Sequence, residues 1–143
     1  ADHVDATPAL PTLPAMRMLL NLLWAIVGGG LITALEYLIG GLVLCATIVG
    51  IPFGVQCFKL AGLALFPFGK DVVEDPTTAG SGALGLIMNI VWFMVAGVWT
   101  CITHLGLALG LAVTIIGIPF ALQHLKLAVL ALFPFGRRVV ELP

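Results

Sequence analysis

Two long apolar runs with almost no charge constrain this chain more than any other feature. From Met18 to Gly69 the only charged residues are Glu36 and Lys59, and from Leu84 to Gly136 the only one is Lys126. Of the 143 residues, 61% are hydrophobic and 9% are charged, whereas soluble domains have about 45–50% apolar and about 25% charged residues. A chain this short cannot bury so much apolar surface by folding alone. We therefore expect an all-α integral membrane protein.

The composition also excludes several classes of function. Six basic and seven acidic residues leave no basic surface for nucleic acid. The only serine, Ser81, falls outside both apolar runs, and no nucleophile stands beside a base, so we expect no enzyme. Three cysteines without a CxxC pair lie inside the runs, which predicts no disulfide, metal or cofactor.

The chain contains a tandem duplication. Ile48–Glu74 and Ile115–Glu141 match at an offset of 67 with 19 identities in 27 positions. Upstream, Asn21–Trp24 matches Asn89–Trp92 at an offset of 68, which indicates one insertion or deletion between the two segments. We place the first inner membrane repeat at 16–69, a cytoplasmic linker at 70–83, the second repeat at 84–136 and a cytoplasmic C-terminal end at 137–143.

Residues 1–15 differ from the rest. They carry two Asp, three Pro and no basic residue, which is unlike a secretory signal peptide. We expect a disordered N-terminal tail or a cloning remnant.

Each repeat is predicted to form a helical hairpin. A membrane-spanning helix needs about 20 apolar residues, so each repeat has room for two. The first hairpin is expected to turn at Gly40–Gly41, and the four transmembrane or re-entrant helices are placed near 18–39, 42–66, 85–107 and 109–133.

The second helix of each hairpin contains Gly-Ile-Pro, at Gly50–Pro52 and Gly117–Pro119. Proline removes a backbone donor and clashes with the preceding turn, which predicts a kink. Alternatively, one long helix ends at the proline, and a remaining segment of about 14 residues is re-entrant or interfacial.

Basic residues flank the apolar runs at three places. Arg17 precedes the first run, Lys70 follows it, and Arg137 and Arg138 follow the second. Because Lys and Arg concentrate on cytoplasmic flanks, we expect these residues to anchor the chain there, with both termini cytoplasmic. Two copies in one orientation are related by an axis along the membrane normal.

The motifs also resemble those of a known family. They are Met16-Arg17, Leu-Asn-Leu-Leu-Trp, Ile-Gly-Ile-Pro-Phe, Gln-x-x-Lys-Leu-Ala and Pro-Phe-Gly-x-x-Val-Val. From Met16 to Val140 the chain resembles the YccF family of bacterial inner membrane proteins, whose unit is a domain with transmembrane helices. The resemblance implies a bacterial inner membrane location and no particular activity. At Glu36 and Tyr37 the sequence departs from the family's usual small residue and Trp.

Lys59 and Lys126 are the first candidates for a function, because charges inside a membrane are costly. Each follows a glutamine by three residues, Gln56 and Gln123, so amide and ammonium share a helix face. One interpretation is that these four side chains line a pore or an anion site. The alternative is that the lysines extend toward the membrane surface.

Glu36 and His104 are matched by the offset of 68. They are candidates for a proton-sensitive pair; alternatively, Glu36 sits at the outer interface and His104 bonds between helices. His124 replaces Cys57 in the second repeat and is interpreted as a polar contact between helices.

The sequence supports two functions. The first is a small multimeric ion channel, anion-selective if its lysines form a ring. The alternative is a non-transporting membrane component that binds anionic lipid or a partner membrane protein. In both cases the many small residues, including Gly106 and Gly110, predict a homo-oligomer.

Overall fold

The computed structural model describes residues 12–78 and 80–143. Most of the predicted N-terminal tail lies outside them, and residues 13–15 of that tail already belong to the first helix. In chain order the first repeat forms α1 (Leu13–Val27), α2 (Gly30–Cys45), α3 (Ile51–Leu65) and β1 (Lys70–Glu74). The second forms α4 (Gly82–Trp92), a π-helical turn η1 (Phe93–Gly97), α5 (Val98–Val113), α6 (Ile118–Leu132) and β2 (Arg137–Glu141).

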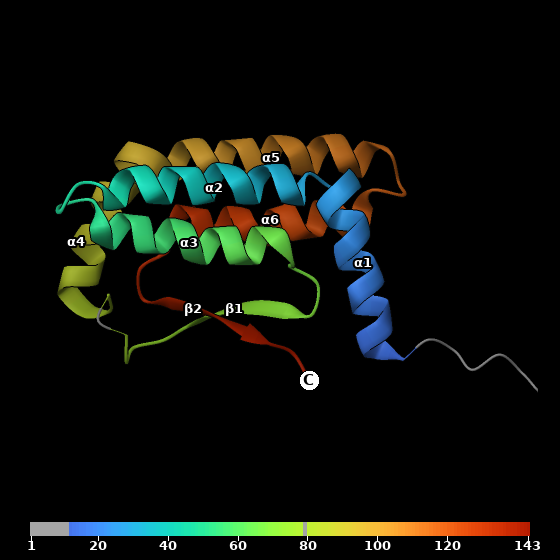
Figure 1. Ribbon diagram of the computed structural model, residues 1–143, viewed down its shortest axis with the longest axis horizontal. Coiled ribbons are helices and arrows are strands. Elements are labelled where there is room, and N and C mark those ends of the chain that lie inside the picture. Colours follow the sequence, from blue (N-terminus) through green and yellow to red (C-terminus); the bar gives the residue numbers. More distant parts are fainter. Residues whose placement is uncertain (1–11, 79) are drawn as a thin grey trace, which may run out of the picture.

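The four central helices form two hairpins that lie side by side. In Figure 1, α2 and α3 make one hairpin and α5 and α6 the other, with the strands beneath them and α1 and α4 at opposite ends. The hairpins touch mainly through α3 and α6, whereas α2 and α5 make few contacts with each other. The fold is therefore a pseudo-twofold pair of hairpins above a small sheet.

The expected hairpin turn at Gly40–Gly41 is wrong. Both glycines lie within α2, and the chain turns between Cys45 and Ile51. The predicted kinks at Gly-Ile-Pro are wrong as well: Gly50 is the N-cap of α3, and Pro52 stands in its first turn. Gly117 and Pro119 start α6 in the same way. Proline is favoured at a helix start because its missing N–H needs no partner there.

The strands were not foreseen. β1 and β2 pair antiparallel, with Val72 opposite Val139 and Lys70 opposite Glu141. They join the segments that follow the two Phe-Pro-Phe-Gly turns, so the end of one repeat pairs with the end of the other. Non-local pairing of this kind leaves only a weak signal in two five-residue segments.

The first repeat has one residue more than the second, and this extra residue lies at the junction of the first two helices. In the first repeat, α1 and α2 are bent by 73° at Gly28–Gly29, and Gly29 adopts φ 84°, which suits a residue without a Cβ. In the second repeat the π-helical turn η1 joins α4 to α5 without a break in the helix. Trp24 and Trp92 match at an offset of 68, whereas Thr33 and Thr100 match at an offset of 67, and each of these threonines donates to the carbonyl four residues earlier.

One continuous helix, Gly82–Val113, is long and apolar enough to cross a membrane, and the bent pair α1–α2 meets the same criteria together. α3 and α6 are shorter apolar helices. The protein is thus mostly helical with one or two candidate membrane spans.

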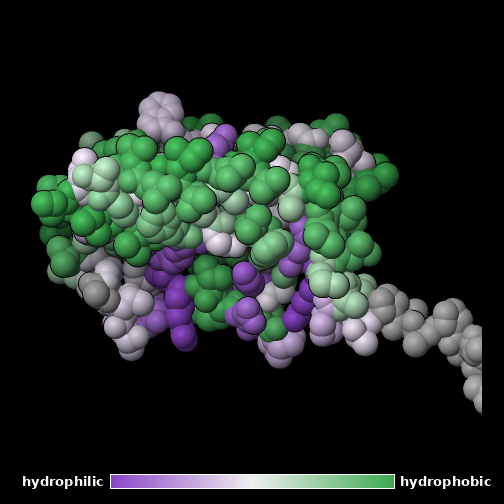
Figure 2. All heavy atoms as spheres, viewed as in Figure 1, coloured by the Kyte–Doolittle hydropathy of each residue, from purple (hydrophilic) through white to green (hydrophobic). Residues whose placement is uncertain are grey.

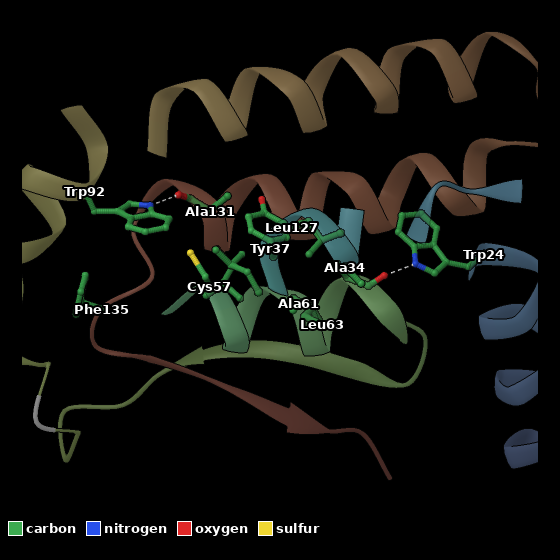
Figure 3. Close-up of a cluster of buried hydrophobic side chains, with 13 residues drawn as sticks. Trp24, Ala34, Tyr37, Cys57, Ala61, Leu63, Trp92, Leu127, Ala131 and Phe135 are labelled. Carbon is green, nitrogen blue, oxygen red and sulfur yellow. Dashed lines mark hydrogen bonds between the residues drawn. The ribbon is translucent and has the colours of Figure 1, made fainter. Parts of the chain in front are cut away.

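The core lies between the hairpins and the sheet. Figure 3 shows Trp24 and Trp92 at opposite ends of it, with Tyr37, Leu127 and the small residues of α3 and α6 between them. The outer surface is apolar as well: in Figure 2 the hydrophobic colour covers the helices, and the hydrophilic residues gather at the strand side.

Candidate functional site

Lys59 and Lys126 connect the two repeats. The Lys59 ammonium donates hydrogen bonds to the carbonyl oxygens of Pro134 (2.5 Å) and Arg137 (2.8 Å). Lys126 donates to those of Pro67 (2.8 Å) and Lys70 (2.6 Å). Each lysine therefore holds the Phe-Pro-Phe-Gly turn of the other repeat, a role that the sequence analysis did not predict.

Gln56 and Gln123 lie one helical turn before the lysines. Their side-chain oxygens are buried and have no hydrogen-bond partner among the described residues. The Gln123 amide nitrogen makes only a long contact, 3.5 Å, to the carbonyl oxygen of Pro119. A pore lined by these glutamines and lysines remains a prediction.

Asn and Trp side chains tie the first helix of each repeat to the end of its third helix. Asn21 donates to the carbonyl of Phe68 and accepts from its N–H, at 3.1 and 2.9 Å. The Trp24 indole donates to the carbonyl of Ala64 at 2.6 Å. The second repeat has the same arrangement: Asn89 bonds the backbone of Phe135, and the Trp92 indole donates to the carbonyl of Ala131. Pairing of this kind satisfies backbone groups that lipid cannot.

Tyr37, His104 and His124 form a buried hydrogen-bonded chain between the repeats. The Tyr37 hydroxyl lies 2.7 Å from His104 Nε2, and His104 Nδ1 lies 3.0 Å from His124 Nδ1. His124 Nε2 lies 2.8 Å from the carbonyl oxygen of Gly28. A carbonyl only accepts, so His124 donates from Nε2, His104 donates from Nδ1, and Tyr37 donates to His104. Every group is then satisfied with both rings neutral.

The predicted match between Glu36 and His104 is replaced by one between Tyr37 and His104. The offset between the repeats changes from 68 to 67 before Glu36 in α2 and His104 in α5. His104 is therefore equivalent to Tyr37, the residue after Glu36. The two threonines Thr33 and Thr100, at the same offset of 67, were a sequence signal for it. Glu36 is exposed on α2, and His104 is 2% exposed.

Charged residues concentrate at the strand face, which we define as β1, β2 and the segments that adjoin them. All the described charged residues except Glu36 belong to it or donate hydrogen bonds to it. Arg17 donates to the main-chain oxygens of Leu142 and Pro143, and Arg138 forms an ion pair with Asp75 at 3.3 Å. The four predicted anchors thus share one side of the molecule: Arg17, Lys70, Arg137 and Arg138.

Two related pockets flank the strand face. One, of about 540 Å³, lies between α1 and the first Phe-Pro-Phe-Gly turn and is lined by Arg17, Asn21 and Lys70. The other, of about 480 Å³, is lined by the equivalent Asn89 and Arg137. The first pocket combines two basic residues and Glu141 with apolar side chains of α1, whereas the second has one basic residue, Arg137, beside Glu74 and Asp75.

No metal site is found in the part of the chain that the structure describes, where no three His, Cys, Asp or Glu side chains cluster suitably. Cys45, Cys57 and Cys101 are free thiols.

Comparison with known proteins agrees with a membrane component. The family model of the inner membrane component domain, YccF, matches residues 19–70 and 87–137. The inner membrane protein YccF of Escherichia coli strain K12 is 35% identical over 132 residues, which cover 88% of each chain. The protein of that name from Shigella flexneri matches equally well. No solved structure matches the chain.

The duplicated apolar repeat, the concentration of charge on one face and these matches agree: the chain belongs to the YccF family of inner membrane proteins.

Proposed function

We propose that this protein is a non-transporting membrane component that enters the bilayer from the cytoplasmic side and binds anionic lipid there. The observation that carries the proposal is the position of the charges, which leaves every other face of the described structure apolar except at Glu36. Such a molecule fits a membrane with its strand face in water and its helices in lipid. The basic flanks orient the strand face, and with it the start of α1 and the C-terminal end, toward the cytoplasm.

The hairpins lie within the membrane and do not cross it. In Figure 1 the central helices run alongside the strand face. α2, α3 and α6 have 15 or 16 residues, and a helix of 16 residues is about 24 Å long, less than the hydrocarbon thickness of about 30 Å. α5 belongs to the longer continuous helix Gly82–Val113, but in Figure 1 the α4 part of that helix leaves the direction of α5 and runs toward the strand face.

The hairpin tips support the same orientation. A hairpin that crossed the bilayer would present its tip to water, but Ile48 and Ile116 at the two tips are 87% and 89% exposed. The side chains of Thr47 and Thr114 bond the backbone there, so the tips tolerate lipid. The sequence analysis allowed for a re-entrant segment of about 14 residues after each proline. The proposal differs from it in that both helices of each hairpin lie within the membrane.

Cysteine labelling tests the orientation. In a chain with its three cysteines replaced by serine or alanine, Ile48→Cys and Ile116→Cys are expected to resist a membrane-impermeant maleimide from both sides of the membrane. Thr77→Cys, in the linker, is the matched control and should react only from the cytoplasmic side. Labelling of the tips from the periplasm would show that the hairpins cross.

The pocket between Arg17 and Lys70 is the proposed lipid site. Lys70 and Arg17 outnumber the one carboxylate of the pocket, Glu141, and the Arg17 guanidinium also donates to the main-chain oxygens of Leu142 and Pro143. The Lys70 ammonium is therefore the group that suits a phosphate, and the exposed Met18 and Leu22 of α1 beside it suit acyl chains. Lys70→Gln is expected to reduce the phosphatidylglycerol retained by the purified protein in native mass spectrometry. Arg138→Gln, a charge change outside this pocket, serves as control. Equal retention of phosphatidylglycerol and phosphatidylcholine by the unaltered protein would contradict the proposal.

A channel is the second candidate, supported by the buried, unpartnered oxygens of Gln56 and Gln123. A channel would have to expose these oxygens, which the described structure encloses within one protomer, to a path for water or ions. The test is chloride and potassium flux in liposomes: selective flux that Gln56→Leu and Gln123→Leu abolish would establish the channel and overturn the first proposal.

A further inference from the structure

A cavity of about 460 Å³ opens between α2 and α5, on the side of Trp92. It exists because the hairpins meet through α3 and α6 and leave α2 and α5 apart. Its wall includes Tyr37, Cys57, Trp92 and Ala96. The volume lies within the range of about 300–1,000 Å³ that is usual for small-molecule sites.

The cavity forms on one side because the repeats differ there. The residue equivalent to Cys57 is His124 and the residue equivalent to Gly40 is Leu107, both at the offset of 67. His124 packs against Trp24, with ring centroids 4.5 Å apart, whereas Cys57 and Gly40 leave space beside Trp92. Two small residues therefore open a site that the other repeat fills.

Glu36 lines the cavity and is the one charged residue of the described structure away from the strand face. Within the described residues it forms neither a salt bridge nor a hydrogen bond through its side chain. A carboxylate in an apolar layer costs about 2.5–3.5 kcal/mol on insertion scales unless a partner compensates it. Among the described residues no group supplies the complementary charge, which leaves Glu36 able to pair with a cation from outside them.

The other polar groups of the cavity are already engaged. Tyr37 donates to His104, and the hydroxyls of Thr33, Thr100 and Thr103 donate to carbonyls one turn earlier in their own helices. Glu36 is thus left as the polar group that can select a ligand. The aromatic side chains of Tyr37 and Trp92 form an apolar wall against which the body of an organic ligand can pack.

We propose that this cavity binds a lipophilic cation, an amphiphilic amine or quaternary ammonium compound whose apolar body lies against Trp92 and whose charge pairs with Glu36. The site is distinct from the lipid pocket at the strand face and does not depend on it. A hydrocarbon chain alone would make no use of Glu36.

Two probes of nearly equal shape and opposite charge test the proposal: tetraphenylphosphonium and tetraphenylborate. In calorimetric titrations of the full chain in detergent micelles, with partition into empty micelles subtracted, we expect saturable binding of tetraphenylphosphonium alone. Glu36→Gln should weaken it at least about tenfold, which corresponds to about 1.4 kcal/mol. Glu74→Gln, the same change on the strand face, should leave it unaltered.

A second variant separates loss of the site from loss of the fold. Gly40→Leu places the side chain of the equivalent residue in the cavity. A Cβ at Gly40 meets no atom within 4 Å and Gly40 lines the cavity, so we expect the variant to lose binding, and its unfolding transition in micelles shows whether the fold is kept. Equal binding of both probes, or tetraphenylphosphonium binding that survives Glu36→Gln, would overturn the proposal in favour of a site for acyl chains. No binding of either probe would overturn it outright. Lys70→Gln should not change the result, which keeps this test independent of the lipid proposal.

Discussion

Lys59 and Lys126 make the same contact in opposite directions across the pseudo-twofold axis. Each ammonium leaves its own repeat and holds two carbonyl oxygens around the Phe-Pro-Phe-Gly turn of the other. The carbonyls are the equivalent pairs Pro134 with Arg137 and Pro67 with Lys70, and the strands that follow these turns pair with each other. The lysines therefore brace the two repeats at the edge of the strand face.

This exchange predicts that the lysines stabilise the fold. Lys59→Met removes the ammonium that donates to the carbonyls of Pro134 and Arg137, and Lys126→Met removes the one that donates to Pro67 and Lys70, of which Pro67 keeps the Lys70 N–H. We expect each change to lower the free energy of unfolding by about 1–3 kcal/mol. Thermal or denaturant unfolding in micelles measures it. Lys70→Met, whose ammonium forms no side-chain hydrogen bond in the described structure, is the control. Unchanged stability of both variants would show that the lysines serve something other than the brace.

The buried chain from Tyr37 to Gly28 predicts one tautomer for each histidine. Nitrogen NMR of the labelled protein is expected to show His104 protonated at Nδ1 and His124 at Nε2, because the Gly28 carbonyl fixes the direction of all three hydrogen bonds. Finding His124 protonated at Nδ1 would exclude this direction.

Tyr37→Phe removes the donor to His104 without removing the ring. The unsatisfied Nε2 should cost about 1–3 kcal/mol in the free energy of unfolding, seen in the same unfolding assay. Phe58→Leu, a change on the neighbouring α3, is a control for altered packing alone. If Tyr37→Phe is as stable as the unaltered protein, a water molecule or a rearranged ring must satisfy His104.

Two sets of glycines are expected to respond differently to alanine. A Cβ at Gly30 or Gly97 would overlap the indole of Trp24 or Trp92, so these variants should lose stability. A Cβ at Gly106 or Gly110 meets nothing within 4 Å, and alanine there should raise helix stability by about 0.5–1 kcal/mol. The same two variants test the proposed homo-oligomer, measured by light scattering: dissociation on Gly106→Ala would place α5 at the subunit contact.

Asp75 predicts a pH-dependent turn in the linker. Hydrogen bonds from the hydroxyl and the N–H of Thr77, followed by the nearby Arg138 guanidinium, hold the pKa of the Asp75 carboxyl below its ordinary value. A lowered pKa means that the charged form stabilises the turn above the ordinary carboxyl range, and that this contribution is lost as pH falls through the lowered value. The amide resonance of Thr77 should follow this titration and stop doing so in Asp75→Asn.

The hydrophobic runs and the duplication could be read directly from the residues, because both are local or periodic properties. They established a helical membrane protein of two similar halves, and the basic flanks at Arg17, Lys70 and Arg137 identified the segments that share a polar side. The family followed from the same motifs. His124, which the sequence predicts to be a polar contact between helices, lies on α6 with its Nδ1 3.0 Å from Nδ1 of His104 on α5.

The positions of the turns could not be read in the same way. Gly40–Gly41 and the segment before Ile51 are both compatible with a turn, and the choice depends on packing: Gly41 contacts the α3 side chains Phe58 and Cys57. Proline likewise fits a kink or a helix start, and only the hairpin geometry decides between them.

The residues alone account for the chemistry of each segment: apolar helices, a twofold repeat and a charged end to each copy. The groups that meet across the axis follow from packing. Each lysine meets the other repeat's turn, Tyr37 meets His104, and Cys57 borders an open cavity whose counterpart is filled by His124. These contacts join residues far apart in the chain, and their register depends on one extra residue near Gly29, whose effect on helix rotation appears only when the two hairpins pack.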